Sequence, residues 1–80
     1  MKKSIGEILK EARLRAGIGQ KKLARKIGVT YEQISRLERG VRGNPTIETL
    51  QRWAEGVGAE LVIEFRFPGD PSPDREGREE

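Results

Sequence analysis

Residues 4–58 divide into four short stretches with apolar side chains at helical spacing, and a glycine follows each stretch. These glycines are Gly17, Gly28, Gly40 and Gly58. A hydroxyl residue suited to cap a helix precedes three of the stretches, at Ser4, Thr30 and Thr46. This punctuation predicts four short helices, and no apolar run is long enough to cross a membrane.

The apolar positions of the four expected helices are predicted to meet in one core. They are Ile5, Ile8, Leu9 and Ala12 in the first helix, Leu23, Ala24 and Ile27 in the second, Ile34 and Leu37 in the third, and Ile47, Leu50, Trp53 or Ala54, and Val57 in the fourth. Glu38 is expected to have a structural role, bonded to a loop N–H, to Arg25 or to Arg42.

The net charge of +3 conceals a basic body and an acidic end. Residues 1–58 hold 13 Lys and Arg against 6 Asp and Glu, whereas residues 59–80 hold 3 against 7. A basic surface of this kind is typical of proteins that bind a polyanion, most simply a DNA backbone. A surface that is charged only for solubility is the alternative interpretation.

The chain has no cysteine and no histidine. Disulfides, thiolate or imidazole metal sites and histidine-based catalytic triads are therefore excluded. The acidic residues are scattered along helices or lie near the C-terminus, as Asp70 and Asp74 do, without a partner that could act as nucleophile or general base. We expect neither a cofactor nor an enzymatic activity.

The second and third expected helices are joined only by Gly28, Val29 and Thr30. Because glycine adopts the left-handed conformation without steric cost, so short a connection predicts two helices that meet at a steep angle. The side chains expected on the outward face of the third helix are Tyr31, Glu32, Gln33, Ser35, Arg36 and Arg39. Such a projecting polar helix suits the major groove of DNA.

Over residues 5–58 the sequence resembles the XRE/Cro-like helix-turn-helix family of phage repressors and bacterial regulators. The resemblance rests on two runs, GQKKLARKIGVTYEQISRLERG and NPTIETLQRWAEGVG. It implies a mainly α, lambda-repressor-like fold of four helices, in which residues 1–58 form a helix-turn-helix DNA-binding domain. Phage repressors have a fifth helix, whereas the C-terminal segment here resembles that of small XRE-type antitoxins of toxin–antitoxin operons.

The resemblance, together with the expected outward face of the third helix and the N-terminal end of the second, indicates which residues bind double-stranded DNA. The expected set is Gln20, Lys21, Thr30, Tyr31, Glu32, Gln33, Ser35, Arg36, Arg39 and Arg42. The candidates for contact with base edges are Tyr31, Glu32 and Arg36, while Gln33, Arg39 and Arg42 would hold the backbone. Arg36 could donate two hydrogen bonds to a guanine. Glu32 is expected to orient Arg36, and acceptance of a bond from a cytosine amino group is the alternative.

Residues 59–67 replace the helical spacing by an alternation of apolar and polar side chains, which predicts a β-strand. Its partner is expected to be the antiparallel strand of a second copy, packed against the first and fourth helices, because no other segment has strand periodicity. The expected dimer contacts are Leu61, Val62, Ile63, Phe65 and Phe67. A register centred on Ile63 is preferred because it sets Glu60 opposite Arg66, and a register centred on Phe65 stays open.

Residues 68–80 have no apolar side chain other than proline, and we expect a disordered acidic tail. Three functions stay open for the chain as a whole. The first is a homodimeric transcriptional repressor that occupies a palindromic operator, in the cytoplasm at the nucleoid. The second is an antitoxin that also neutralises a cognate toxin, and the third is a protein-interaction module that does not bind DNA.

Overall fold

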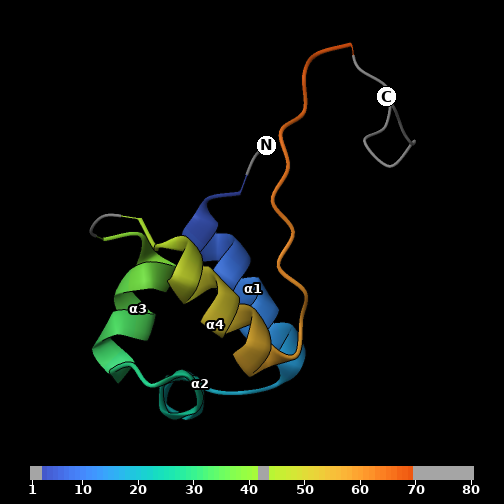
Figure 1. The fold of residues 1–80 in the computed structure, drawn as a ribbon. Helices are drawn as coiled ribbons and strands as arrows, with labels where there is room; N and C mark the ends of the chain where they lie inside the picture. The colour runs from blue at the N-terminus through green and yellow to red at the C-terminus, as the bar shows by residue number, and fades with distance from the viewer. Residues whose placement is uncertain (1–2, 42–43, 70–80) are drawn as a thin grey trace.

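Four α-helices form the body of the computed structural model, which describes residues 3–41 and 44–69 (Figure 1). The helices are α1 (Ile5–Ala16), α2 (Gln20–Ile27), α3 (Tyr31–Arg39) and α4 (Ile47–Val57). Both α1 and α2 pack against α3 and α4. The expected four-helix architecture is therefore confirmed.

Each helix ends at the glycine that the sequence pattern predicts. The φ angles of Gly17, Gly28, Gly40 and Gly58 lie between 68° and 78°. Side chains other than glycine are strained in this conformation, so the glycine stops each helix within one residue. At the opposite ends, the side chains of Ser4, Thr30 and Thr46 each accept a hydrogen bond from the backbone N–H three residues later.

The core lies where the four helices meet. Its buried apolar residues are Leu9, Leu23, Ala24, Ile27, Ile34 and Trp53. Trp53 is the largest of them and only 1% exposed, and its indole Nε1–H donates to the carbonyl oxygen of Leu9 at 3.1 Å. This bond satisfies the single polar group of a side chain that otherwise contributes apolar area.

The buried face of α1 differs from the prediction. Its buried residues are Gly6, Leu9 and Arg13. Ile5 and Ile8, expected in the core, are 45% and 52% exposed, and Ile47 of α4 is 54% exposed. The reason lies at Gly6, where an added Cβ would be 2.5 Å from the carbonyl oxygen of Glu38. Because the backbones of α1 and α3 touch at Gly6, Ile5 and Ile8 lie at the flank of α1 and not in the core.

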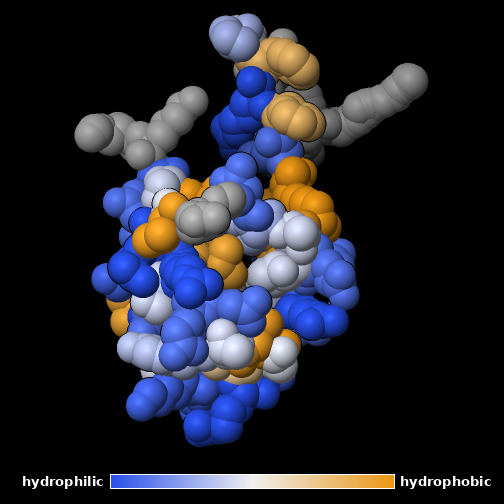
Figure 2. Space-filling view, turned by 90° about the vertical axis from the view of Figure 1, so that its left-hand side faces the viewer, coloured by the Kyte–Doolittle hydropathy of each residue, from blue (hydrophilic) through white to orange (hydrophobic). Residues whose placement is uncertain are grey.

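Residues 59–69 leave the end of α4 and project away from the helices (Figures 1 and 2). In the ranges that the structure describes, they form no β-strand. A strand needs a neighbour for its N–H and C=O groups, and a single copy of this chain offers none. The apolar side chains from Val62 to Phe67 accordingly remain 58% to 85% exposed. Strand pairing between two copies stays a prediction.

The prediction of an acidic tail falls mostly outside the described residues, which end at Gly69. Pro68 and Gly69 form a turn directly after the extended segment. Among the helices in the described ranges, none has the length and apolar character needed to span a membrane.

Candidate nucleic-acid interface

The turn between α2 and α3 is held by hydrogen bonds to one residue of α2. The carbonyl oxygen of Ala24 accepts from the N–H of Gly28 at 2.9 Å and from the N–H of Val29 at 3.0 Å. Val29 is half-buried and packs against the core. With Gly28 in the left-handed conformation, this arrangement ends α2 and starts α3 within three residues, as the sequence predicts.

A reciprocal pair of bonds fixes the first turn of α3. Thr30 Oγ1 accepts from the backbone N–H of Gln33 at 3.1 Å, and Gln33 Oε1 accepts from the backbone N–H of Thr30 at 3.0 Å. This is the capping box expected from the sequence. Thr30 and Gln33 therefore have a structural task in the free protein in addition to any contact with DNA.

The body of α3 presents most of its side chains to solvent. Its exposed residues are Tyr31, Glu32, Gln33, Arg36 and Arg39, and Ser35 is half-buried. Only Ile34 and Glu38 are fully buried, at 0% and 8% exposure. Arg39 Nε donates to Ser35 Oγ at 3.2 Å along this face. No ion pair joins Glu32 to Arg36 among the described residues, so the expected orientation of Arg36 by Glu32 is not present in the free protein.

The start of α2 lies beside the start of α3. Gly19 precedes α2 and supplies no side-chain cap, and the first turn of α2 contains no acidic residue. Lys21 Nζ lies 5.6 Å from the centroid of the Tyr31 ring, within the range of a cation–π interaction. The positive end of α2 and the first residue of α3 thus lie on one side of the molecule, where both can approach a phosphate backbone.

Glu38 is hydrogen-bonded to Arg13 of α1 and to Gln20 of α2. The expected bond to Arg25 is not present, so that alternative is wrong. Arg13 donates from Nε to Glu38 Oε2 at 2.5 Å and from Nη2 to Oε1 at 3.0 Å. Gln20 Nε2 also donates to Oε1 at 3.0 Å. The hydrogen bond to Glu38 raises the pKa of the Arg13 guanidinium against the opposing effect of burial. Arg42, the other expected partner, lies outside the described residues.

Sequence reasoning missed Arg13, although a signal was present. Arg13 follows Leu9 by four residues and therefore lies on the buried stripe of α1. A charge in that position needs a buried counterion, and Glu38 is the acid nearest the equally sparse apolar stripe of α3. Gln20, expected at the DNA, is half-buried and shares this carboxylate.

Comparison with known proteins places this geometry in a family. The helix-turn-helix family model matches residues 9–62. The chain is 34% identical over 73 residues to the uncharacterized HTH-type transcriptional regulator y4dJ of Sinorhizobium fredii, a match that covers 91% of this chain and 92% of the relative. The chain belongs to the XRE/Cro-like helix-turn-helix family. As a member of this family, the chain is a DNA-binding transcriptional regulator.

A solved crystal structure agrees with the four-helix body. The crystal structure of a threonine-to-alanine mutant of the restriction-modification controller protein C.Esp1396I superposes with a TM-score of 0.66 at 32% identity. The match covers 70% of this chain and 73% of the controller protein. The fold therefore supports the assignment to the helix-turn-helix family independently of the relative.

The surface of the molecule on the side of α3 is hydrophilic over most of its area (Figure 2). Figure 2 looks onto the side of the molecule on which α3 lies in Figure 1, and polar residues cover most of the helical body there. The larger apolar area in this view belongs to the segment that rises above the helices. A polar, cation-bearing face suits a hydrated and anionic ligand such as DNA.

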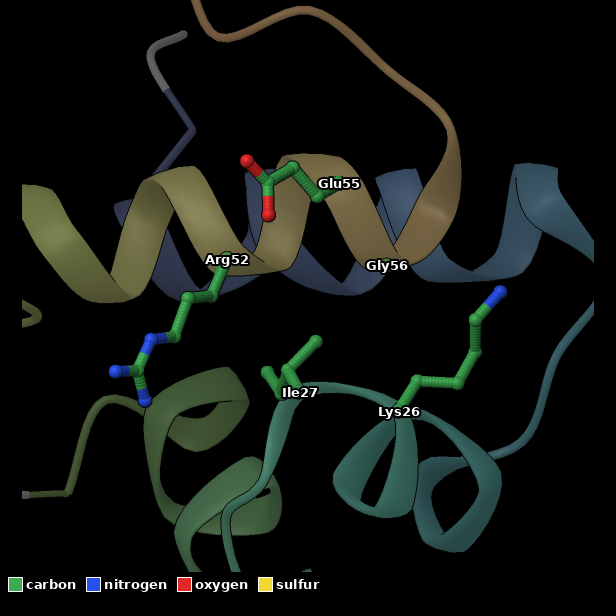
Figure 3. A pocket seen from close by; sticks show the side chains of 5 residues that line it. All are labelled: Lys26, Ile27, Arg52, Glu55 and Gly56. Carbon is green, nitrogen blue, oxygen red and sulfur yellow. The ribbon is translucent and has the colours of Figure 1, made fainter.

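A pocket of this helix-turn-helix domain lies between α2 and α4. It is a shallow pocket of about 310 Å³ lined by Lys26, Ile27, Arg52, Glu55 and Gly56 (Figure 3). Lys26 and Arg52 approach the gap from opposite ends, and Arg52 Nη2 is bonded to Glu48 Oε2 at 3.0 Å. Of the residues predicted to contact DNA, none of those that the structure describes lines this pocket.

Proposed function

We propose that the protein acts as a homodimeric repressor that inserts α3 of each copy into the major groove of a palindromic operator. The observation that carries the proposal is the exposed polar face of α3, in which only Ile34 and Glu38 are fully buried. A helix of this kind can enter a groove without exposing core residues. Occupation of the operator would then block the promoter.

Within this proposal, Arg36 reads a base and the residues around it hold the backbone. Arg36 is exposed in the last turn of α3, where its guanidinium is free to donate two hydrogen bonds to guanine O6 and N7. Tyr31 and Glu32 are the other candidates for base edges. The proposed backbone contacts are Gln20, Lys21, Thr30, Gln33, Ser35, Arg39 and Arg42.

The proposed dimer joins residues 59–67 of two copies as antiparallel strands centred on Ile63. The exposure of Phe65 and Phe67, at 85% and 68%, supports it, because four such rings in a dimer bring roughly 600–1,000 Å² of aromatic surface to the contact. Exposed Ile5 and Ile8 on α1 would lie under the paired strands. A stable interface of standard size buries about 1,200–2,000 Å², which these groups together approach.

Selection of bound fragments from random duplex DNA tests the repressor proposal. The expected result is a palindrome with half-sites about one helical turn, or roughly 34 Å, apart. The variant Arg36→Ala should lose preference at one base pair of each half-site, equivalent to about 1–3 kcal/mol of discrimination. Arg15→Ala, an exposed arginine on α1, is the matched control and should retain the wild-type preference. An unchanged preference in Arg36→Ala refutes the role of Arg36.

An antitoxin role is the second candidate, and the acidic C-terminal sequence favours it. Residues 68–80 carry five acidic residues and two arginines, which suits a basic partner protein. A neighbouring gene for a small basic toxin, and co-purification of the two products, would support this role.

A protein-interaction module that does not bind DNA is the remaining alternative. The absence of any electrophoretic mobility shift of duplex DNA at about 150 mM salt would favour it.

A further inference from the structure

We propose that Glu38 is a positioning residue that holds the side chain of Gln20 in the one orientation that can contact a DNA phosphate. The inference rests on the proposed function, because it concerns one of the backbone contacts named there. It assigns a part in DNA binding to a buried residue that cannot itself reach the DNA.

The geometry begins with a carboxylate that is already held in place. Both oxygens of Glu38 accept bonds from Arg13, and Arg13 Nη1 donates in addition to the carbonyl oxygen of Ile18 at 3.0 Å. Arg13 and Glu38 are 7% and 8% exposed, so neither side chain can move without breaking the core. Glu38 is therefore a fixed acceptor, and Gln20 has to adapt to it.

A carboxylate determines which end of the amide faces it. An ionised carboxylate can only accept hydrogen bonds, whereas the amide of glutamine has a donating end and an accepting end of nearly the same shape. Gln20 must therefore turn Nε2 toward Glu38, which it does at 3.0 Å. The inverted orientation would set two oxygen acceptors against each other.

The consequence for DNA binding follows from the second N–H of the same Nε2 atom. One N–H is directed at Glu38, and no residue in the described part of the chain accepts a bond from the other, which is left as a donor at the first residue of α2. A phosphate oxygen also only accepts, so it needs that donor and would be repelled by the amide oxygen. Glu38 thus excludes the unproductive orientation of Gln20 before DNA arrives, and less conformational entropy is lost on binding.

A double-mutant cycle separates positioning from simple structural support. Gln20→Ala is made in the wild-type chain and in a charge-free background, Arg13→Met/Glu38→Leu, which removes the acceptor and its counterion together. Affinity is measured for a duplex that the wild-type protein selects from random DNA, with the folded fraction of each protein determined beforehand. We expect Gln20→Ala to weaken binding roughly 3- to 10-fold in the wild-type chain and less than about twofold in the charge-free background. An equal loss in both backgrounds would mean that Glu38 is structural only.

A measurement on the unmodified protein decides the matter if the charge-free background does not fold. In ¹⁵N-labelled wild-type protein, the two Nε2 protons of Gln20 should differ, with one slow to exchange because Glu38 accepts it. The exposed amide of Gln51 on α4 is the internal control. Addition of the selected duplex should shift the other Gln20 proton and leave the protected one in place. Two Nε2 protons of Gln20 that both exchange with water as fast as those of Gln51 would overturn the proposal.

These results distinguish failure of the inference from failure of the proposed function. If no duplex is selected by the wild-type protein, the repressor proposal fails, and the proton measurement still tests the bond between Glu38 and Gln20. If Arg36→Ala changes the preference while Gln20→Ala has no effect in the wild-type chain, DNA recognition stands and the positioning role is wrong.

Discussion

Arg13 and Glu38 are two charged side chains inside a core that is otherwise apolar. Each is less than a tenth exposed, and they share two hydrogen bonds between α1 and α3. The desolvation of such a pair offsets much of its attraction, so its net contribution to stability is small. Loss of a single partner is different, because it leaves the other charge buried and unpaired.

The variant Arg13→Met should therefore be far less stable than the variant in which both charges are removed. We expect Arg13→Met to lower the free energy of unfolding by about 3–5 kcal/mol, and Arg13→Met/Glu38→Leu to lower it by much less. Urea unfolding of the two proteins measures the difference. Equal destabilisation of both would show that the ion pair itself contributes strongly.

This pair also marks a limit of sequence-based prediction. The structural role of Glu38 can be predicted from its place near a turn, but its partner Arg13 lies 25 residues away, and no local pattern joins the two. The outward placement of Arg36 and Tyr31 is predictable, because their neighbours Ile34 and Leu37 already define the inner face of α3. Contacts with DNA itself depend on a second molecule and remain a proposal.

The ends of the helices are set by local chemistry, which explains why they can be predicted. A cap such as Thr30 and a stop such as Gly28 act within four residues of chain. The buried face of α1 is set instead by the distance to another helix. Gly6, without a side chain, allows the backbones of α1 and α3 to touch, and nothing in the pattern of Ile5 and Ile8 reveals this contact.

Substitution of Gly6 by alanine should force α1 away from α3. The added Cβ would lie 2.5 Å and 2.6 Å from the carbonyl oxygens of Glu38 and Leu37, which are backbone atoms that cannot rotate away. We expect a loss of about 1–3 kcal/mol in the free energy of unfolding. Gly19→Ala, where no atom lies within 4 Å of the added Cβ and φ is −82°, is the matched control. A loss no greater than that of Gly19→Ala would contradict the close approach.

The capping boxes of α1 and α3 allow the effect of a cap on stability to be separated from its effect on DNA binding. Ser4 and Thr30 form the same reciprocal capping box, on α1 and α3. Ser4→Ala and Thr30→Ala should each lower the free energy of unfolding by about 0.5–2 kcal/mol, as measured by thermal or urea unfolding. Only Thr30→Ala should also weaken DNA binding, when both proteins are assayed well below their melting temperatures. Equal effects on binding would place α3 away from the DNA.

At the scale of the whole molecule, the residues that the structure describes extend 44 Å along their longest axis and about half of that along the other two, 23 Å and 21 Å. The projecting segment after α4 is the visible origin of this elongation (Figure 1). An extended chain with exposed aromatic side chains and unpaired backbone groups is poorly suited to remain alone in water. The proposed pairing with a second copy would cover these aromatic side chains and give the unpaired backbone groups hydrogen-bond partners.

Phe65→Asp should convert a dimer into monomers. The substitution places a charge among side chains that the proposed strand pair would bury, and the cost falls on both copies. Light scattering after size-exclusion chromatography measures the mass directly. Leu14→Asp, at a position of α1 that is 56% exposed, is the control and should not change it. A wild-type protein that is monomeric at all concentrations would contradict the dimer.

The salt dependence of DNA binding tests the proposed dimer as well. If the dimer neutralises about 6–8 phosphates, the logarithm of its affinity should fall against the logarithm of salt concentration with a slope of about −5 to −7. Lys21→Ala should reduce the magnitude of this slope, whereas Gln20→Ala, a neutral substitution, should not. An affinity that does not change with salt concentration would be incompatible with the proposed contacts to several phosphates.

Trp53 gives the molecule a built-in optical reporter. It is the single tryptophan of the chain, it is 1% exposed, and its indole is tethered to α1 by the bond to Leu9. Its emission should therefore shift to longer wavelength when the core opens and stay constant when a ligand covers α3. Loss of the core can therefore be followed in an unlabelled sample, with or without a ligand on α3.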